Sequence, residues 1–226
     1  GVLSEAIFKV LPKPARSLSL GLRGLDDMTA ISALTAALGS TFAVSAAAHI
    51  PASIGSDSTT IVRLEGSEGS VAYGSRELAR LWCSFGLPDL IEGDESANFW
   101  LRIRDAHWLA QPMDRSIWRL SLAPSKAPHV LADIRQKLGV RYFFDWGGGL
   151  VWLAVVDADD AGASVVREAM ANTGGHATLV RASSEMRHRI DVFEPLPPAV
   201  LKLTQEIKKC FDPDRVLNFG RMYAGI

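Results

Sequence analysis

The sequence predicts an α+β fold built from two consecutive β-α-β-β-α-β units. Segments with the alternating apolar pattern of strands and segments with the 3.6-residue period of helices occur in this order, and the order is repeated after a helix expected around residues 99–108. The chain has 226 residues, 48% of them hydrophobic, which is enough for a core without a metal or a disulfide. The fold class is therefore two tandem ferredoxin-like units forming antiparallel sheet with helices on one side, plus a C-terminal helix and an irregular tail.

The first unit begins with a strand in which Leu18, Leu20 and Leu22 alternate with smaller residues. Asp26 and Asp27 are typical helix-capping residues, and the helix that follows is expected to end at Gly39. The expected elements are strands at 17–22, 42–50, 59–64 and 87–91, and helices at 28–38 and 71–85.

The second unit repeats this order, with a glycine turn between its two middle strands. The expected strands are 117–122, 140–146, 150–157 and 176–182, and the expected helices are 125–138 and 161–173.

The two ends of the chain lie outside the units. Residues 5–11 alternate like a short strand and stop at the stiff linker Pro12-Lys13-Pro14. Near the other end, a proline-rich stretch at 195–198 predicts the start of a helix, which is followed by the irregular residues 211–226. Residues 28–56 contain no charged side chain, but Gly39 and Pro51 divide them into a helix-length and a strand-length piece, so no transmembrane segment is expected.

Composition argues against several functions. The chain carries 24 Lys and Arg against 25 Asp and Glu, with no block of like charges, so no nucleic-acid partner is expected. Cys83 and Cys210 are far apart and belong to no CxxC motif, which is typical of a reduced, cytoplasmic protein. The sequence contains no HExxH, GxSxG or SxxK motif, so neither a catalytic metal nor covalent hydrolase chemistry is expected.

Gly147-Gly148-Gly149 has two interpretations. A phosphate-binding loop needs a helix directly after its glycines, whereas here a strand is expected to follow. The favoured interpretation is a hairpin turn with residues at positive φ.

Three polar residues at strand positions are candidates for a substrate site. His176 opens the last strand of the second unit and is placed to exchange a proton with a bound acid, or simply to make a hydrogen bond at the strand end. Arg119 and Arg181 alternate with apolar neighbours inside strands, so they either face solvent or present guanidinium groups to a carboxylate. Asp145 precedes the glycine turn and is placed to orient one of these arginines.

A family resemblance adds to these observations. The run at 211–223, Phe-Asp-Pro-Asp-Arg-Val-Leu-Asn-Phe-Gly-Arg-Met-Tyr, resembles the F-D-P-x-x-x-L-N-P-G-R-x-Y ending of FAD-linked oxidases of the vanillyl-alcohol oxidase superfamily. Asp145-Trp146-Gly147-Gly148 and the Gly-Gly-His-Ala-Thr-Leu run at 174–179 resemble the E-type FAD-binding subunits of glycolate oxidases.

The resemblance implies a C-terminal cap domain at 15–226 and, at 1–14, the last strand and linker of an FAD-binding domain that is otherwise missing. FAD would then be bound mainly by that upstream domain, and the isolated chain is expected to be inactive. The implied enzyme transfers a hydride from a 2-hydroxy acid such as glycolate to the flavin, with an arginine holding the carboxylate. Its implied partners are a second flavoprotein subunit and an iron–sulfur subunit, and attachment to the inner membrane through them is left open.

By position, the resemblance implies that Asn218 lies beside the flavin and that Gly220 and Arg221 shape the same tail. These three are the implied cofactor-binding residues. Phe219 replaces the usual Pro, whose ring would fix φ. The metal motif of related D-lactate and D-2-hydroxyglutarate dehydrogenases is absent. The alternative function is a non-catalytic ferredoxin-like module for subunit assembly or ligand binding.

Overall fold

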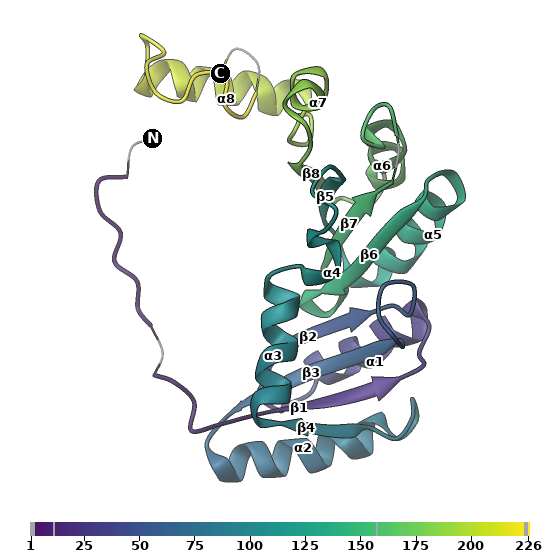
Figure 1. Ribbon diagram of the computed structural model, residues 1–226. Coiled ribbons are helices and arrows are strands. Elements are labelled where there is room, and N and C mark those ends of the chain that lie inside the picture. Colours follow the sequence, from purple (N-terminus) through teal and green to yellow (C-terminus); the bar gives the residue numbers. More distant parts are fainter. Residues whose placement is uncertain (1–2, 11, 157, 224–225) are drawn as a thin grey trace.

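The computed structural model describes residues 3–10, 12–156, 158–223 and 226. Its centre is an eight-stranded antiparallel sheet with the strand order β4-β1-β3-β2-β6-β7-β5-β8 (Figure 1). The strands are β1 Arg16–Arg23, β2 Val44–Ile50, β3 Thr59–Gly66, β4 Asp89–Glu92, β5 Ser116–Ser121, β6 Val140–Asp145, β7 Leu150–Val155 and β8 His176–Arg181.

Two ferredoxin-like units form this sheet, as expected from the sequence. In each unit the fourth strand pairs with the first, the first with the third and the third with the second, giving β4-β1-β3-β2 and β8-β5-β7-β6. The second strands of the two units, β2 and β6, meet in the middle with His49 opposite Phe144. The predicted fold class is confirmed.

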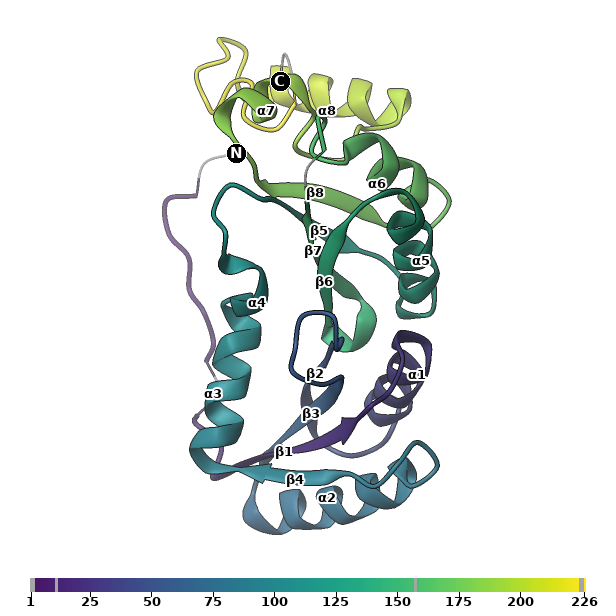
Figure 2. The same ribbon diagram turned by 45° about the vertical axis from the view of Figure 1, so that its right-hand side comes forward.

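Four helices cover one face of the sheet (Figure 2). They are α1 Asp27–Leu38, α2 Glu68–Trp82, α5 Ala127–Lys137 and α6 Ala163–Met170. Asp26 caps α1 as predicted, because its carboxylate accepts the Thr29 amide at 3.0 Å. The larger core lies between these helices and the sheet, where Trp82 and Trp118 are fully buried and donate their indole N–H groups to the carbonyls of Ala33 and Ala161.

The opposite face is partly covered by α3 Gly93–Arg104 and α4 His107–Ala110, which connect the two units. The polar stretch before residue 99 is part of α3, because Asp94 and Glu95 suit the first turn of a helix and Ser96 is buried against Ser19 at 2.8 Å. Ala106, at φ 46°, separates the two helices. A second core forms here around Trp100, Trp108 and Phe143.

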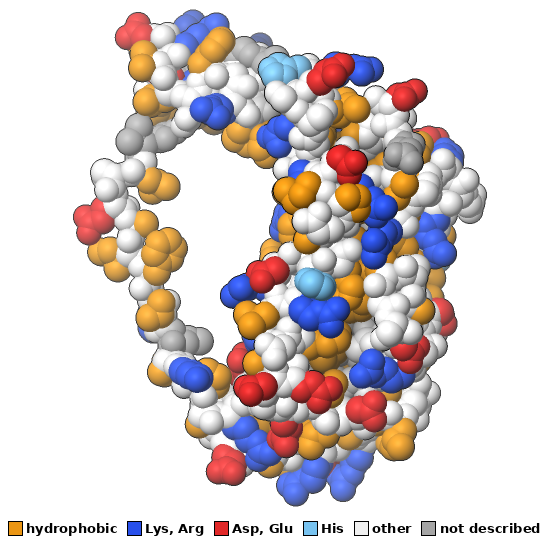
Figure 3. Space-filling view, viewed as in Figure 1, with side chains coloured by type: hydrophobic (Ala, Val, Ile, Leu, Met, Phe, Trp, Pro, Cys, Tyr) orange, Lys and Arg blue, Asp and Glu red, His pale blue; other side chains and the backbone are white. Residues whose placement is uncertain are grey.

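The terminal segments project from the units. Residues 3–10 carry no regular secondary structure, because a strand needs a paired neighbour and none of the described strands lies beside them. Residue 11 of the expected strand is outside the described residues. Leu3, Ile7, Phe8 and Val10 are each at least 80% exposed, and hydrophobic side chains follow this segment in Figure 3.

At the other end, a short helix that the sequence pattern did not predict, α7 Ser184–Arg189, is followed by the predicted helix α8 Pro198–Phe211. None of the residues of α8 is buried. Within the described ranges no helix combines the length and apolar character needed to cross a bilayer.

Candidate functional site

The sheet face opposite α5 and α6 carries the candidate site. Arg119 in β5 pairs with Trp152 in β7 and with Thr178 in β8, so these three side chains share that face. Ser121, which is next along the same face of β5, pairs with His176. Alternation along the strands therefore places Arg119 and His176 on one surface. A substrate site that uses both residues requires this arrangement.

Arg119 is a cation of this surface that has no acidic partner among the described residues. Its side chain is half-buried, and its guanidinium carbon lies 5.2 Å from the centroid of the Trp146 ring. Within the described part of the chain, the structure gives Arg119 no hydrogen bond and no ion pair with an acidic group. A half-buried guanidinium without an acceptor is suited to bind an anion.

Trp146 stands at the rim of this surface with 62% of its area exposed. Its backbone adopts φ 51°, which is unusual for a bulky side chain. The Asp145 carboxylate accepts the Trp146 amide at 2.8 Å and so stabilises this conformation. Burial raises the pKa of Asp145, and the hydrogen bond from Trp146 opposes the change.

The glycine turn behind Trp146 packs against α1. Gly147 and Gly148 have φ 65° and 98°, and an added Cβ would lie 2.2 Å from Leu38 Cδ1 at the first and 2.7 Å from Ile31 Cδ1 at the second. Glycine is needed here for both conformation and close packing. The hairpin interpretation is confirmed, since the turn joins the antiparallel strands β6 and β7 and both glycines have positive φ.

A cavity of about 1000 Å³ lies beside Asp145 and Trp146, and its walls come from both units. The first unit contributes Ser45 and Arg63, and α3 contributes Trp100. Arg63 is already engaged: its Nε donates to Ser45 Oγ at 3.0 Å, its NH2 lies 3.2 Å from Glu65, and its guanidinium lies over the Trp100 ring.

Arg181 is fully occupied by the backbone. Its guanidinium donates to the carbonyls of Leu109, Ala110, Pro112 and Arg115 at 3.0 to 3.2 Å, and to Met113 Sδ at 3.6 Å. An arginine has five N–H donors, so none is left for a substrate. This argues against the expectation that Arg181 holds a carboxylate, because its contacts fasten β8 to the end of α4 and to the loop that follows it.

The C-terminal tail is organised by Asp212, which is buried. Its carboxylate accepts the amides of Val216 and Leu217 at 2.9 Å and lies 2.6 Å from Lys208 Nζ. The hydrogen bond from Lys208 and then those backbone amides hold the pKa of Asp212 below its usual range. The three predicted cofactor residues of this tail, Asn218, Gly220 and Arg221, are exposed. Asn218 and Gly220 have φ 50° and 69°, a conformation that both residue types tolerate.

Sequence reasoning missed part of this arrangement. Neither Arg63 nor the exposure of Trp146 follows from local pattern, because both depend on how β2 and β6 meet. An unusual signal was available at Asp145-Trp146, where a large aromatic residue directly precedes three glycines. Among the described residues, no group of three or more His, Cys, Asp or Glu side chains is placed to hold a metal ion.

Comparison with known proteins shows what this chain resembles. The chain is 33% identical over 225 residues to glycolate oxidase subunit GlcE of Escherichia coli (strain K12), which covers 99% of this chain and 54% of that protein. The predicted resemblance is confirmed. The chain thus spans about half the length of the GlcE subunit that it matches. No family model matches the sequence.

Solved structures share the fold of this chain. The chain aligns with p-cresol methylhydroxylase with substrate bound at a TM-score of 0.66 and 14% identity, covering 94% of this chain and 53% of that one. A 4-ethylphenol oxidase from Gulosibacter chungangensis in an isoeugenol complex aligns at a TM-score of 0.60 and 13% identity, covering 94% of this chain and 55% of the oxidase. An alkyldihydroxyacetonephosphate synthase aligns at a TM-score of 0.56 and 10% identity, covering 89% of this chain and 44% of the synthase.

Proposed function

We propose that this chain is the cap domain of an FAD-dependent oxidase or dehydrogenase subunit that oxidises a 2-hydroxy acid of the glycolate type. In this proposal residues 15–226 form the cap and residues 1–14 end an FAD-binding domain. The resemblance to glycolate oxidase subunit GlcE supports it. The observation that carries it is Arg119, a half-buried cation without an acidic partner among the described residues, beside the exposed ring of Trp146.

Arg119 is assigned to the substrate carboxylate. The planar guanidinium can donate to both oxygens of a carboxylate at once, which fixes the direction of the α-carbon. Half burial strengthens this interaction relative to one in bulk water. A base on the same surface then takes the proton of the substrate hydroxyl; His176 and Asp145 are the candidates, because His176 lies on the face of Arg119 and Asp145 lines the cavity beside it.

The residues present fit the flavin ring of FAD but not its pyrophosphate. FAD, when bound, would supply the two-electron oxidation by taking the hydride of the α-carbon. Trp146, which is 62% exposed, offers an aromatic surface on which a flat ring can rest. Gly147 and Gly148 are packed against α1, so the pyrophosphate is assigned to the upstream domain. Asn218, Gly220 and Arg221 in the exposed tail are assigned to the flavin side of the cap.

The further assignments follow the resemblance. A second flavoprotein subunit and an iron–sulfur subunit are proposed as partners, and the cytoplasm is proposed as the location. The isolated chain is expected to be inactive because it would lack most of the contacts to FAD.

Steady-state kinetics of the natural full-length protein test the role of Arg119. Arg119→Ala should raise the KM for glycolate about tenfold or more, since a hydrogen bond to a charged group is lost, while the bound flavin stays unchanged. Arg76→Ala is the matched control, because Arg76 is exposed on α2, which belongs to the first unit and covers the face of the sheet opposite the site. An unchanged KM in Arg119→Ala would remove this arginine from the site.

The alternative is a non-catalytic assembly module, which the apolar side of α8 favours. Val200, Leu203, Ile207 and Phe211 are 45%, 61%, 51% and 79% exposed and lie at helical spacing. The two functions separate in the same full-length protein: if the chain is an assembly module only, Leu203→Asp should abolish subunit assembly, whereas Arg119→Ala should leave the KM for glycolate unchanged.

A further inference from the structure

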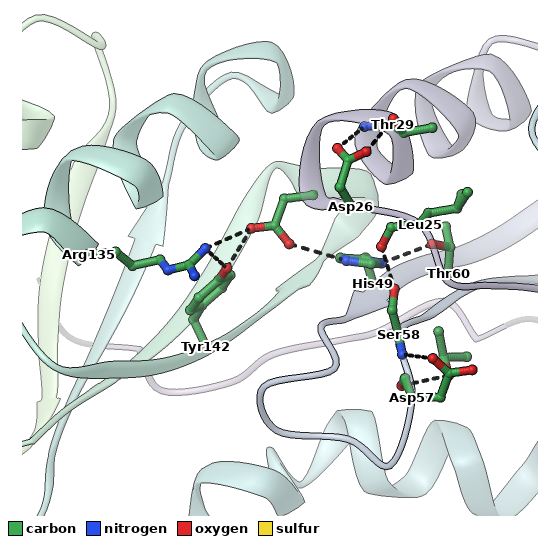
Figure 4. A network of polar contacts seen from close by, with 11 residues as sticks. Leu25, Asp26, Thr29, His49, Asp57, Ser58, Thr60, Arg135 and Tyr142 are labelled. Carbon is green, nitrogen blue, oxygen red and sulfur yellow. Dashed lines mark hydrogen bonds and ion pairs between the residues drawn. The ribbon is translucent and has the colours of Figure 1, made fainter.

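The two units of the sheet meet along a short seam. His49 in β2 is the register partner of Phe144 in β6, and the helix-covered side of this seam carries a network of polar side chains (Figure 4). His49 and Thr60 come from the first unit, whereas Arg135 and Tyr142 come from the second. The network therefore joins elements that the backbone ladder connects only briefly.

Asp27, the first residue of α1, is the centre of this network. Its Oδ2 accepts the Tyr142 hydroxyl at 2.5 Å and lies 3.9 Å from Arg135 NH1. Its Oδ1 lies 3.3 Å from His49 Nε2. Arg135 also donates to the Tyr142 hydroxyl at 2.9 Å, and His49 Nδ1 lies 2.9 Å from Thr60 Oγ1. One carboxylate thus holds groups of both units.

Burial makes the bond from Tyr142 the strong link across the seam. His49 and Thr60 are fully buried and Tyr142 is 2% exposed, while the Asp27 side chain keeps 19% of its area exposed, so water competes only weakly with the bond between Tyr142 and Asp27. Burial, and then the hydrogen bond to Asp27, raise the pKa of Tyr142, so its hydroxyl keeps the proton that it donates. His49 Nε2, although near Asp27, makes no hydrogen bond to the described atoms.

The strands that carry this network also carry the two walls of the cavity. β2 holds His49 on one face and Ala46 on the other, and β6 holds Tyr142 before it ends at Asp145. We propose that Asp27 is a positioning residue for the candidate site. By holding Tyr142 it fixes β6 against the first unit, and so sets where Asp145 and Trp146 stand relative to the wall formed by β2.

This proposal rests on the location of the proposed site and not on the identity of its ligand. The glycine turn gives a second attachment, since Gly147 packs against Leu38 of α1. Loss of the Tyr142 hydroxyl should therefore loosen the seam locally and leave both units folded.

Hydrogen exchange of the full chain, followed segment by segment, tests the role of Asp27. Tyr142→Phe should lower the protection of the amides in β2 and in residues 142–148 about tenfold, because a buried bond to a charged group is lost. Protection in β1 and β8, which lie away from the seam, should not change. The control is Tyr73→Phe, which removes a hydroxyl from a residue 57% exposed on α2 and should alter neither region.

A second pair of variants separates positioning from general stability. Asp27→Asn keeps an oxygen for the Tyr142 hydroxyl and should retain most of the seam protection that Asp27→Ala loses. An unchanged seam in Tyr142→Phe, or an equal loss of protection across all strands, would overturn the proposal. Because neither flavin nor substrate is needed, this result is independent of the kinetics of Arg119.

Discussion

The guanidinium of Arg119 lies over the indole ring of Trp146, with 5.2 Å between the guanidinium carbon and the ring centroid. The two residues come from β5 and from the turn after β6, so the sheet brings them together. A cation–π contact at an exposed ring contributes only about 0.5 to 1 kcal/mol. Arg119 can therefore turn toward a stronger anionic partner at little cost.

The two strand arginines should differ sharply in their effect on stability. Arg181→Ala leaves four backbone carbonyls without their donor and should lower the free energy of unfolding by about 2 kcal/mol or more. Arg119→Ala should change it by no more than about 1 kcal/mol, because only the contact with the Trp146 ring is lost. Urea denaturation of both variants measures the difference, and equal losses would contradict the two roles.

Gly147→Ala should destabilise the chain through both conformation and packing. The new Cβ would stand 2.2 Å from Leu38 Cδ1 at φ 65°, so a loss of about 3 kcal/mol is expected. Gly24→Ala is the control: its φ is 76°, but nothing lies within 4 Å of the added Cβ, so only about 1 kcal/mol should be lost. Thermal unfolding compares the two, and a larger loss for Gly24→Ala would refute the packing argument.

Asp145 should make stability fall with rising pH. Because burial raises its folded pKa above the unfolded value, the native state binds the proton more tightly. The contribution of Asp145 to the free energy of unfolding is fully present below the pKa of the unfolded state, which is about 3.9. It is lost as the pH rises through the pKa of the folded state. Asp145→Asn should remove this part of the pH dependence in urea titrations, and an identical pH profile in both proteins would contradict it.

Asp212 should hold the tail with the opposite pH dependence. Its lowered pKa means that its contribution is present above the usual Asp pKa and is lost as pH falls through the folded value. Asp212→Ala should speed tryptic cleavage after Arg215 and Arg221, because the amides of Val216 and Leu217 lose their acceptor. Asp214→Ala, at an exposed neighbour, should leave the cleavage rate unchanged.

Much of the fold could be predicted because its signals are local. Alternation at Leu18, Leu20 and Leu22 fixes which side of β1 is buried, and Asp26 and Gly39 mark the ends of α1. The polar start of α3 was missed, because buried Ser96 and solvent-facing acidic residues look like a loop when read without their tertiary contacts. The strand expected at 5–11 depends on a neighbour that the chain does not provide in the described structure.

Less of the site could be predicted, because it depends on contacts between distant segments. Alternation placed Arg119 and His176 on one face, but it could not distinguish Arg119 from Arg181, whose donors are taken by the carbonyls of residues 109–115. The network around Asp27 was likewise invisible: it joins residues more than 100 positions apart, such as Asp27 and Tyr142.

The most direct test of the central claim is a fluorescence titration of FAD with the isolated 226-residue chain and, in parallel, with the natural full-length protein. A cap whose cofactor is held mainly elsewhere predicts flavin retention by the full-length protein and none by the isolated chain. Stoichiometric, tight FAD binding by the isolated chain would contradict the claim, as would a full-length protein that retains no flavin.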